Sequence, residues 1–97
     1  MADEQTFHMY ILRCADGNLY VGSTEDILSR LHVHNTGRGP LFTRIRLPVQ
    51  LVHSEPHATF SDARVREIQV KKWSRAKKEA LVAGDQAELK RLSKRRT

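Results

Sequence analysis

The feature that most constrains this chain is the stretch from Met9 to His34, where two short strand patterns joined by a turn lead into a helix pattern. Residues 9–12 predict a buried first strand, and residues 19–21 predict a second. Asp16-Gly17 between them is typical of a hairpin. The stretch therefore predicts a β-hairpin followed by a helix.

The length of the turn decides whether two tyrosines share a face of the sheet. A two-residue turn would pair Tyr20 with Arg13 and place Tyr10 and Tyr20 on opposite faces, because side chains alternate along a strand. Glycine is also preferred as the third residue of a three-residue loop. A loop over residues 15–17 pairs Tyr10 with Gly22 and brings both phenols to one face. We predict the three-residue loop.

The helix after the hairpin is predicted from about Thr24 to Asn35. Residues 23–26 resemble a capping box, and Gly37 supplies a stop. Arg30 and His34 are four residues apart, so they lie one above the other at the edge of the buried side. That buried side is expected to consist of Ile27, Leu28 and Leu31.

The middle of the chain predicts a loop and a third strand. Residues 36–47 read as a loop or a short irregular helix with three arginines that could contact phosphate: Arg38, Arg44 and Arg46. Residues 48–53 predict a strand that begins at a proline, where a missing donor is tolerated, and residues 55–57 are expected to end it.

The longest helical pattern runs from Thr59 to about Ala83, with Thr59 or Ser61 as its cap. Its sheet-facing side is predicted to contain Val65, Ile68, Trp73, Ala76 and Ala80, and Gln69 is also expected to face the core. A second stripe holds one acid among four bases: Arg64, Glu67, Lys71, Arg75 and Lys78. Asp85 can cap a last helix over residues 86–94, and residues 90–97 are too basic to stay ordered without a partner.

The length of 97 residues predicts one domain over residues 1–97, with a core over 7–83 and a basic helix and tail over 85–97. The chain contains no run long enough for a membrane span and no secretory leader pattern. Cys14 is its single cysteine, which excludes an intramolecular disulfide and favours the reducing cytoplasm.

The distribution of charge points to a polyanion. The chain carries 17 Lys and Arg against 11 Asp and Glu, a net charge of +6. Residues 64–97 hold twelve of the bases and four of the acids. Such a basic half favours nucleic acid as a partner. A solvated helix with a disordered basic tail explains the charge equally well.

The ordered set of Met9-Tyr10, Tyr20-Val21-Gly22, Arg30, His34 and a helical Glu67 resembles the GIY-YIG nuclease domain. The resemblance covers roughly residues 7–81 and is closest to small stand-alone bacterial members. His8-Met9 replaces the Gly-Ile of the first signature, and Val21 replaces an isoleucine. The resemblance implies an α/β (α+β) fold with a three-stranded antiparallel sheet flanked by helices.

The resemblance also implies chemistry: a metal-dependent endonuclease that uses Mg²⁺ or Mn²⁺ to hydrolyse phosphodiester bonds in DNA, with branched or damaged DNA among its suggested substrates. Glu67 resembles the family's carboxylate metal ligand. Tyr20 resembles the general base or the residue that positions the attacking water. Arg30 resembles the arginine that holds the scissile phosphate, and Tyr10 and His34 resemble supporting residues.

Two other functions remain open. A non-catalytic nucleic-acid-binding module could use the same fold, and a partner subunit could dock its basic tail on an acidic protein. Taken singly, the two tyrosines could be strand aromatics and Glu67 could form an ordinary helix ion pair with Lys71. The candidate nucleic-acid-binding residues are Arg38, Arg44, Arg46, Arg64, Lys71, Arg75 and Lys78.

Overall fold

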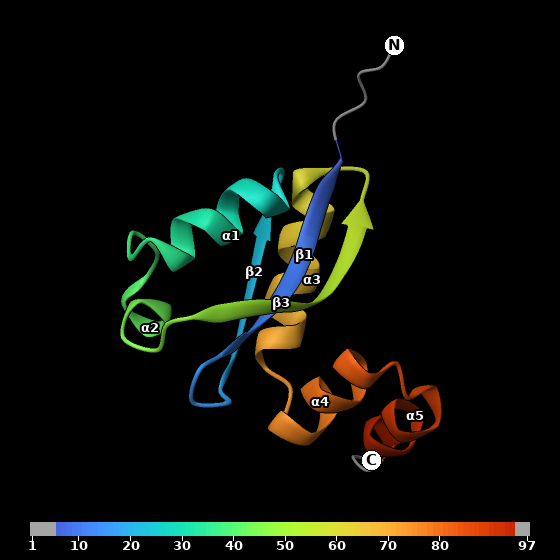
Figure 1. Ribbon diagram of the computed structural model, residues 1–97. Helices are drawn as coiled ribbons and strands as arrows, with labels where there is room; N and C mark the ends of the chain where they lie inside the picture. The colour runs from blue at the N-terminus through green and yellow to red at the C-terminus, as the bar shows by residue number, and fades with distance from the viewer. Residues whose placement is uncertain (1–5, 95–97) are drawn as a thin grey trace.

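The structure is a computed structural model that describes residues 6–94. Its centre is an antiparallel three-stranded sheet in the order β2-β1-β3 (Figure 1). The strands are β1 (Phe7–Cys14), β2 (Leu19–Thr24) and β3 (Val49–His57). Helices flank the sheet, so the predicted fold class is confirmed.

The hairpin between β1 and β2 has the predicted three-residue loop. The Cys14 amide donates to the Asn18 carbonyl (2.8 Å), and the Gly17 amide donates to the Cys14 carbonyl (2.9 Å). Gly17 adopts φ 89°, a left-handed conformation that glycine accepts without strain. Tyr10 pairs with Gly22, as predicted, so the two tyrosines lie on the same face of the sheet.

The two faces of the sheet are covered by different helices. On one face, Met9, Ile11 and Val21 pack against residues of α3 (Phe60–Lys71) and α4 (Arg75–Ala83). On the other face, a cluster that includes Tyr10 packs against Leu31 of α1 (Ile27–Asn35). Successive residues of β1 therefore belong to two separate cores, because side chains alternate across a strand.

The predicted start of α1 is wrong. Ser23 and Thr24 remain in β2, where they pair with β1, and the helix begins at Ile27 with Asp26 as its cap, which accepts from the Ser29 amide at 3.1 Å. Leu28 is 78% exposed rather than buried, because α1 turns His34 and Leu31 toward the sheet.

The end of α1 follows the prediction. Gly37 adopts φ 80°, and the amides of Gly37 and Arg38 donate back to the carbonyls of His34 and Val33. This pair of bonds is the Schellman arrangement, which favours glycine at the left-handed position.

The segment after α1 contains the short helix α2 (Leu41–Arg44), as one of the two predicted alternatives. The third strand is longer than predicted, because residues 55–57 continue it and pair with β1. Pro56 is accommodated since β3 is an edge strand, where a missing amide donor removes no ladder bond.

The single long helix was predicted wrongly in two respects. The helix breaks after Lys71, and Ser74 caps α4 by accepting from the Lys77 amide at 3.2 Å. The side of α3 that meets the sheet consists of Ala63, Glu67 and Val70, whereas the residues predicted there are exposed: Val65, Ile68 and Gln69. Trp73, in the break, and Ala80, on α4, are packed as expected, and Ala76 is exposed.

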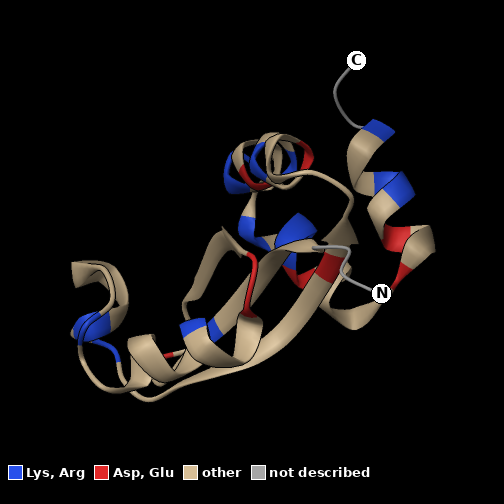
Figure 2. Cartoon of the chain, turned by 90° about the horizontal axis from the view of Figure 1, so that it is seen from above, with Lys and Arg blue, Asp and Glu red and all other residues tan. Residues whose placement is uncertain are grey.

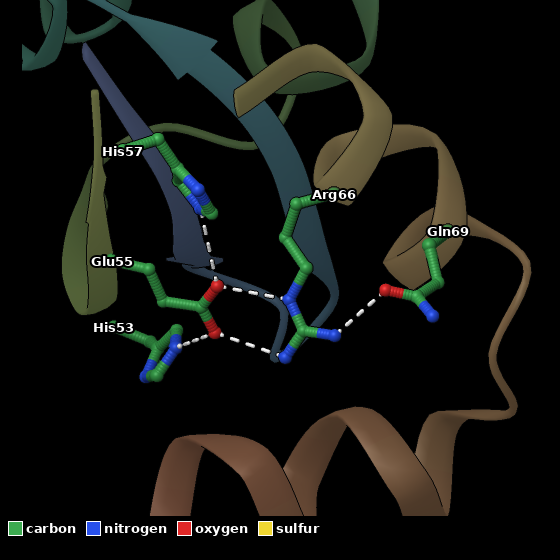
Figure 3. Close-up of polar contacts among 5 residues, drawn as sticks. All are labelled: His53, Glu55, His57, Arg66 and Gln69. Atoms are coloured by element: carbon green, nitrogen blue, oxygen red, sulfur yellow. Dashed lines mark hydrogen bonds and ion pairs between the residues drawn. The ribbon is translucent and has the colours of Figure 1, made fainter. Parts of the chain in front are cut away.

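A polar cluster ties β3 to α3 (Figure 3). The Arg66 guanidinium from α3 donates to both carboxylate oxygens of Glu55 on β3, at 2.9 and 3.1 Å. His53 lies 2.9 Å from the same carboxylate and His57 lies 3.5 Å from it. Gln69 accepts from Arg66 at 2.8 Å. The cluster fixes α3 relative to the edge of the sheet.

The last helix, α5 (Gln86–Lys94), is confirmed, with the Asp85 carboxylate accepting from the Glu88 amide at 3.0 Å. Residues 90–94 belong to this helix and are not an unordered tail, and Leu89 packs against the core on the α3 side. The predictions for residues 1–5 and 95–97 fall outside the described part of the chain. Within residues 6–94, no helix combines the length and apolar character needed to cross a bilayer.

Candidate active site

A solvent-open pocket of about 520 Å³ lies at the free edge of β2 and brings together four of the five predicted catalytic residues: Tyr10, Tyr20, Arg30 and Glu67. The tyrosines and Arg30 belong to the α1 side of the sheet, and Glu67 belongs to the α3 side. The pocket combines residues from both faces because β2 has no strand beyond it.

Gly22 gives Tyr10 access to this pocket. Tyr10 lies on the central strand directly opposite Gly22, and a Cβ atom at Gly22 would lie 2.6 Å from the phenolic oxygen. Any side chain at position 22 would therefore displace the phenol. The rings of Tyr10 and Tyr20 lie 6.4 Å apart between centroids.

His34, the fifth predicted residue, lies behind the tyrosines and does not line the pocket. It is 1% exposed, and its Nε2 atom is 3.1 Å from the phenolic oxygen of Tyr10. Its ring centroid is 5.2 Å from that of Tyr20. Burial, together with the charge of Arg30, lowers the pKa of His34, so the imidazole is neutral at pH 7.

Both phenols are protonated at neutral pH. Burial, reinforced by the nearby Tyr20, raises the pKa of Tyr10 far above its ordinary value. Burial also raises the pKa of Tyr20, although the charges of Lys71 and Arg30 oppose it. The two hydroxyl groups therefore act first as hydrogen-bond donors and acceptors, and a phenolate would need additional positive charge nearby.

Glu67 is an ionised carboxylate held by three donors although it is only 4% exposed. Ser23 donates to its Oε1 atom at 2.6 Å and Arg64 at 3.3 Å, and the Lys71 ammonium lies 2.8 Å from Oε2. Burial alone would raise the pKa of Glu67, but the hydrogen bonds from Lys71 and Ser23 hold it below its usual range.

The donor set of this pocket suits a hard divalent cation with few protein ligands. In residues 6–94 no three His, Cys, Asp or Glu side chains are grouped to hold a metal ion. Two carboxylates line the pocket, Glu25 and Glu67, and Glu67 is the one that was predicted as the metal ligand. Mg²⁺ is commonly bound through one or two carboxylates and keeps water and substrate oxygens as its other ligands. The open pocket leaves room for them, and Lys71, with 48% of its side chain exposed, can move aside.

The predicted nucleic-acid-binding residues lie in three places, because the four that were expected on one helical stripe are divided between two of them. Arg64 lines the pocket and Lys71 pairs with Glu67 there. Arg75 donates to the Gly17 carbonyl of the hairpin loop at 2.8 Å, and Lys78 lies beside Arg75 at a small cleft. The break after α3 separates these two pairs.

The other three predicted arginines lie in the α2 region. Arg46 pairs with Asp16 at 3.0 Å and lies over the ring of Phe42, 4.1 Å from its centroid. Arg38 and Arg44 are exposed. Figure 2 shows basic residues spread over several elements, not gathered on one of them.

Two residues of the site were not predicted from the sequence. Ser23 donates to Glu67, and its position beside Gly22 on a strand is the pattern that could have placed it on the α3 face. Thr43 contacts His34 Nδ1 at 2.8 Å, but it lies in the irregular segment around α2, where no periodicity indicates which side chains are buried.

Comparison with known proteins identifies the family. The sequence model of one protein family, the GIY-YIG catalytic domain, matches residues 6–80 of this chain. A UPF0213 protein of Bacillus pumilus is 41% identical over 80 residues, which are 82% of each chain. A UPF0213 protein of Staphylococcus saprophyticus is 46% identical over 78% of this chain and 93% of its own.

Two solved structures are also similar. The solution structure of a UPF0213 protein from Bacillus halodurans is 38% identical, with a TM-score of 0.53 over 88% of this chain and 93% of that one. A solution structure from E. faecalis is 35% identical, with a TM-score of 0.57 over 87% and 90% of the two chains. The chain therefore belongs to the GIY-YIG catalytic domain family, and its relatives include the small bacterial UPF0213 proteins.

Proposed function

We propose that this chain is an endonuclease that hydrolyses phosphodiester bonds in DNA and depends on a divalent metal ion, Mg²⁺ or Mn²⁺. The observation that carries the proposal is the ionised carboxylate of Glu67 in one open pocket with Tyr10, Tyr20 and Arg30. GIY-YIG nucleases typically use a divalent metal, and the donor set described above suits one.

The side chains of the pocket have separate roles in this proposal. Arg30 is exposed at the pocket wall, where its guanidinium would bind the scissile phosphate through paired charge-assisted hydrogen bonds. The Tyr20 hydroxyl would orient the attacking water. To take the proton of that water, Tyr20 would first lose its own proton to solvent, and the charges of Lys71, Arg30 and the metal ion would favour the phenolate. Tyr10 would support Tyr20. Glu67 would hold the metal ion, which supplies positive charge to the phosphate oxygens and the leaving group.

The test is cleavage of a supercoiled plasmid with and without Mg²⁺ or Mn²⁺. Glu67→Gln removes the charge that recruits the metal while it keeps most of the shape, so cleavage should fall by at least about a hundredfold, which corresponds to roughly 2.7 kcal/mol of transition-state stabilisation. Glu88→Gln is the matched control, because Glu88 pairs with Arg91 on α5, outside the pocket. Cleavage by Glu67→Gln at a rate near wild type would exclude Glu67 as the metal ligand.

A nucleic-acid-binding module without catalysis is the alternative. The observation in its favour is that both oxygens of Glu67 already contact cationic side chains, Arg64 and Lys71, as a purely structural glutamate would. In that case the wild-type protein binds DNA but shows no metal-dependent nicking, and Glu67→Gln binds DNA slightly more tightly because a negative charge has gone.

A further inference from the structure

A buried chain of polar contacts runs from the pocket into the α2 segment. The phenolic oxygen of Tyr10 is 3.1 Å from His34 Nε2, and His34 Nδ1 is 2.8 Å from the hydroxyl of Thr43. The Thr43 hydroxyl donates to the carbonyl oxygen of Pro40 at 3.2 Å. His34 is 1% exposed, Thr43 0% and Tyr10 3%, so the ring nitrogens of His34 and the Thr43 hydroxyl must find their partners among these groups.

The space around His34 and Thr43 is closely filled. A Cβ atom at Gly39 would lie 2.7 Å from His34 Nδ1 and 3.2 Å from the Thr43 hydroxyl. Because Gly39 has no side chain, its backbone can lie directly against His34 and Thr43. No larger residue would fit at position 39 without displacing them. As a result, the orientation of the imidazole ring is fixed by packing.

The contacts determine the direction of each hydrogen bond. The Pro40 carbonyl can only accept, and Thr43 has one hydroxyl proton, which its contact with Pro40 uses. The Thr43 oxygen must then accept from His34, so the proton of the neutral imidazole lies on Nδ1. His34 Nε2 is left as an acceptor, and Tyr10 donates to it.

The opposite tautomer makes one hydrogen bond fewer within this chain of contacts. With the proton on Nε2, His34 would donate to Tyr10 and Thr43 would donate to His34. The Thr43 contact with Pro40 would then join two acceptors, and the Pro40 carbonyl would keep only its bond from the Arg44 amide, at 2.9 Å. The neutral state of the ring, described above, makes the two ring nitrogens chemically distinct.

We propose that Thr43 is a positioning residue that holds His34 in the Nδ1–H tautomer, so that Nε2 accepts the proton of Tyr10 and the lone pairs of the phenol face the pocket. Given the proposed nuclease function, Tyr10 is then oriented to accept a hydrogen bond from a water molecule beside the scissile phosphate. The tautomer itself does not depend on that function.

The test is ¹⁵N NMR of the histidine side chains, which identifies the protonated ring nitrogen through its coupling to the ring carbon protons. In the wild-type protein His34 should show a protonated Nδ1 and a bare Nε2. Thr43→Val keeps the shape but removes the hydroxyl, so the His34 signal should shift toward the Nε2–H form. Thr43→Ser should retain the wild-type pattern. The signal of His34 is assigned by its loss in His34→Gln.

Thr36→Val is the matched control, because the Thr36 hydroxyl donates to the Val33 carbonyl on the same helix end and should leave the His34 tautomer unchanged. A wild-type His34 protonated on Nε2 overturns the proposal, even if Thr43→Val fails to fold. An unchanged His34 pattern in folded Thr43→Val also overturns it.

A kinetic readout separates this proposal from the nuclease function. If the chain cleaves DNA, Thr43→Val should lower kcat by about tenfold to a hundredfold, the range for residues that orient a site residue from behind, with KM nearly unchanged and Thr43→Ser near wild type. If His34 shows the expected tautomer but the protein does not cleave DNA, only the nuclease function is refuted. The role of Thr43 in orienting Tyr10 through His34 would stand.

Discussion

Glu67 shows how one residue can look ordinary in the sequence and unusual in the structure. On a helical wheel Glu67 is the one acidic residue on a stripe of four basic residues. An ordinary i, i+4 ion pair with Lys71 would account for its position there. In the structure Glu67 is almost fully buried, and it also accepts a hydrogen bond from the Ser23 hydroxyl. The Lys71 ammonium, 2.8 Å from Oε2, occupies a position where a metal ion would bind the same oxygen.

Lys71 should therefore compete with the metal ion for Glu67. Lys71→Met removes both the charge that pairs with Glu67 and the repulsion that a dication would meet. An i, i+4 helix pair contributes about 0.5 kcal/mol and the repulsion about as much, so Mn²⁺ should bind about two- to tenfold more tightly. Lys72→Met makes the same change one residue further on and is the control. Free Mn²⁺ measured by electron paramagnetic resonance gives both affinities. Unchanged or weaker binding by Lys71→Met would contradict this.

Among the elements, the junction of β3 and α3 positions the helix that carries Glu67. Arg66 binds Glu55 through two hydrogen bonds, and His53 and His57 flank the same carboxylate (Figure 3). Burial alone would raise the pKa of Glu55, but the hydrogen bonds from Arg66 and His53 hold it below its usual value of 4.5. Glu55 therefore stabilises the fold at neutral pH.

This depressed pKa has a consequence for acid stability. The contribution of Glu55 is present above its unfolded pKa and is lost as the pH falls from about 4.5 through the lower folded value. Glu55→Gln should lower the free energy of unfolding at pH 7 by about 1–3 kcal/mol, because Arg66 loses its partner. Its stability should then decline less than that of the wild type between about pH 5 and 3. Urea unfolding at several pH values measures both effects.

Glu88→Gln provides the comparison for Glu55→Gln, since the pair of Glu88 with Arg91 is exposed and exposed pairs contribute little. Its unfolding curve at pH 7 should stay close to wild type. A Glu55→Gln variant that loses stability in acid as steeply as the wild type would show that Glu55 is not a source of the acid sensitivity.

In the whole molecule, the basic side chains lie in separate regions of the surface, some at the pocket and others away from it. Arg30 and Arg64 lie at the pocket, from α1 and α3, whereas Lys90 lies beside a second groove between α4 and α5. If DNA is bound at the pocket, its phosphates contact the first two side chains and not the third. Salt dependence distinguishes these regions because each phosphate contact contributes separately.

We expect Arg30→Gln and Arg64→Gln each to reduce the slope of log affinity against log salt concentration by about 0.9, and Lys90→Gln to leave it unchanged. Binding of a short duplex is measured by fluorescence anisotropy without divalent metal, so that no cleavage interferes. Equal slopes for the wild type and both arginine variants would place the DNA elsewhere on the molecule.

The sequence alone determined the hairpin, its three-residue loop and the shared face of Tyr10 and Tyr20, because local turn chemistry and the alternation of a strand decide them. It also determined where α1 ends, before Gly37, and where α5 begins, after Asp85. The tertiary structure decided which side of α3 is buried, since a buried Glu67 needs the partners that it finds there, Ser23, Arg64 and Lys71. It likewise decided the contact of Thr43 with His34, because a contact between side chains of two separate helices, α1 and α2, depends on packing that no local pattern encodes.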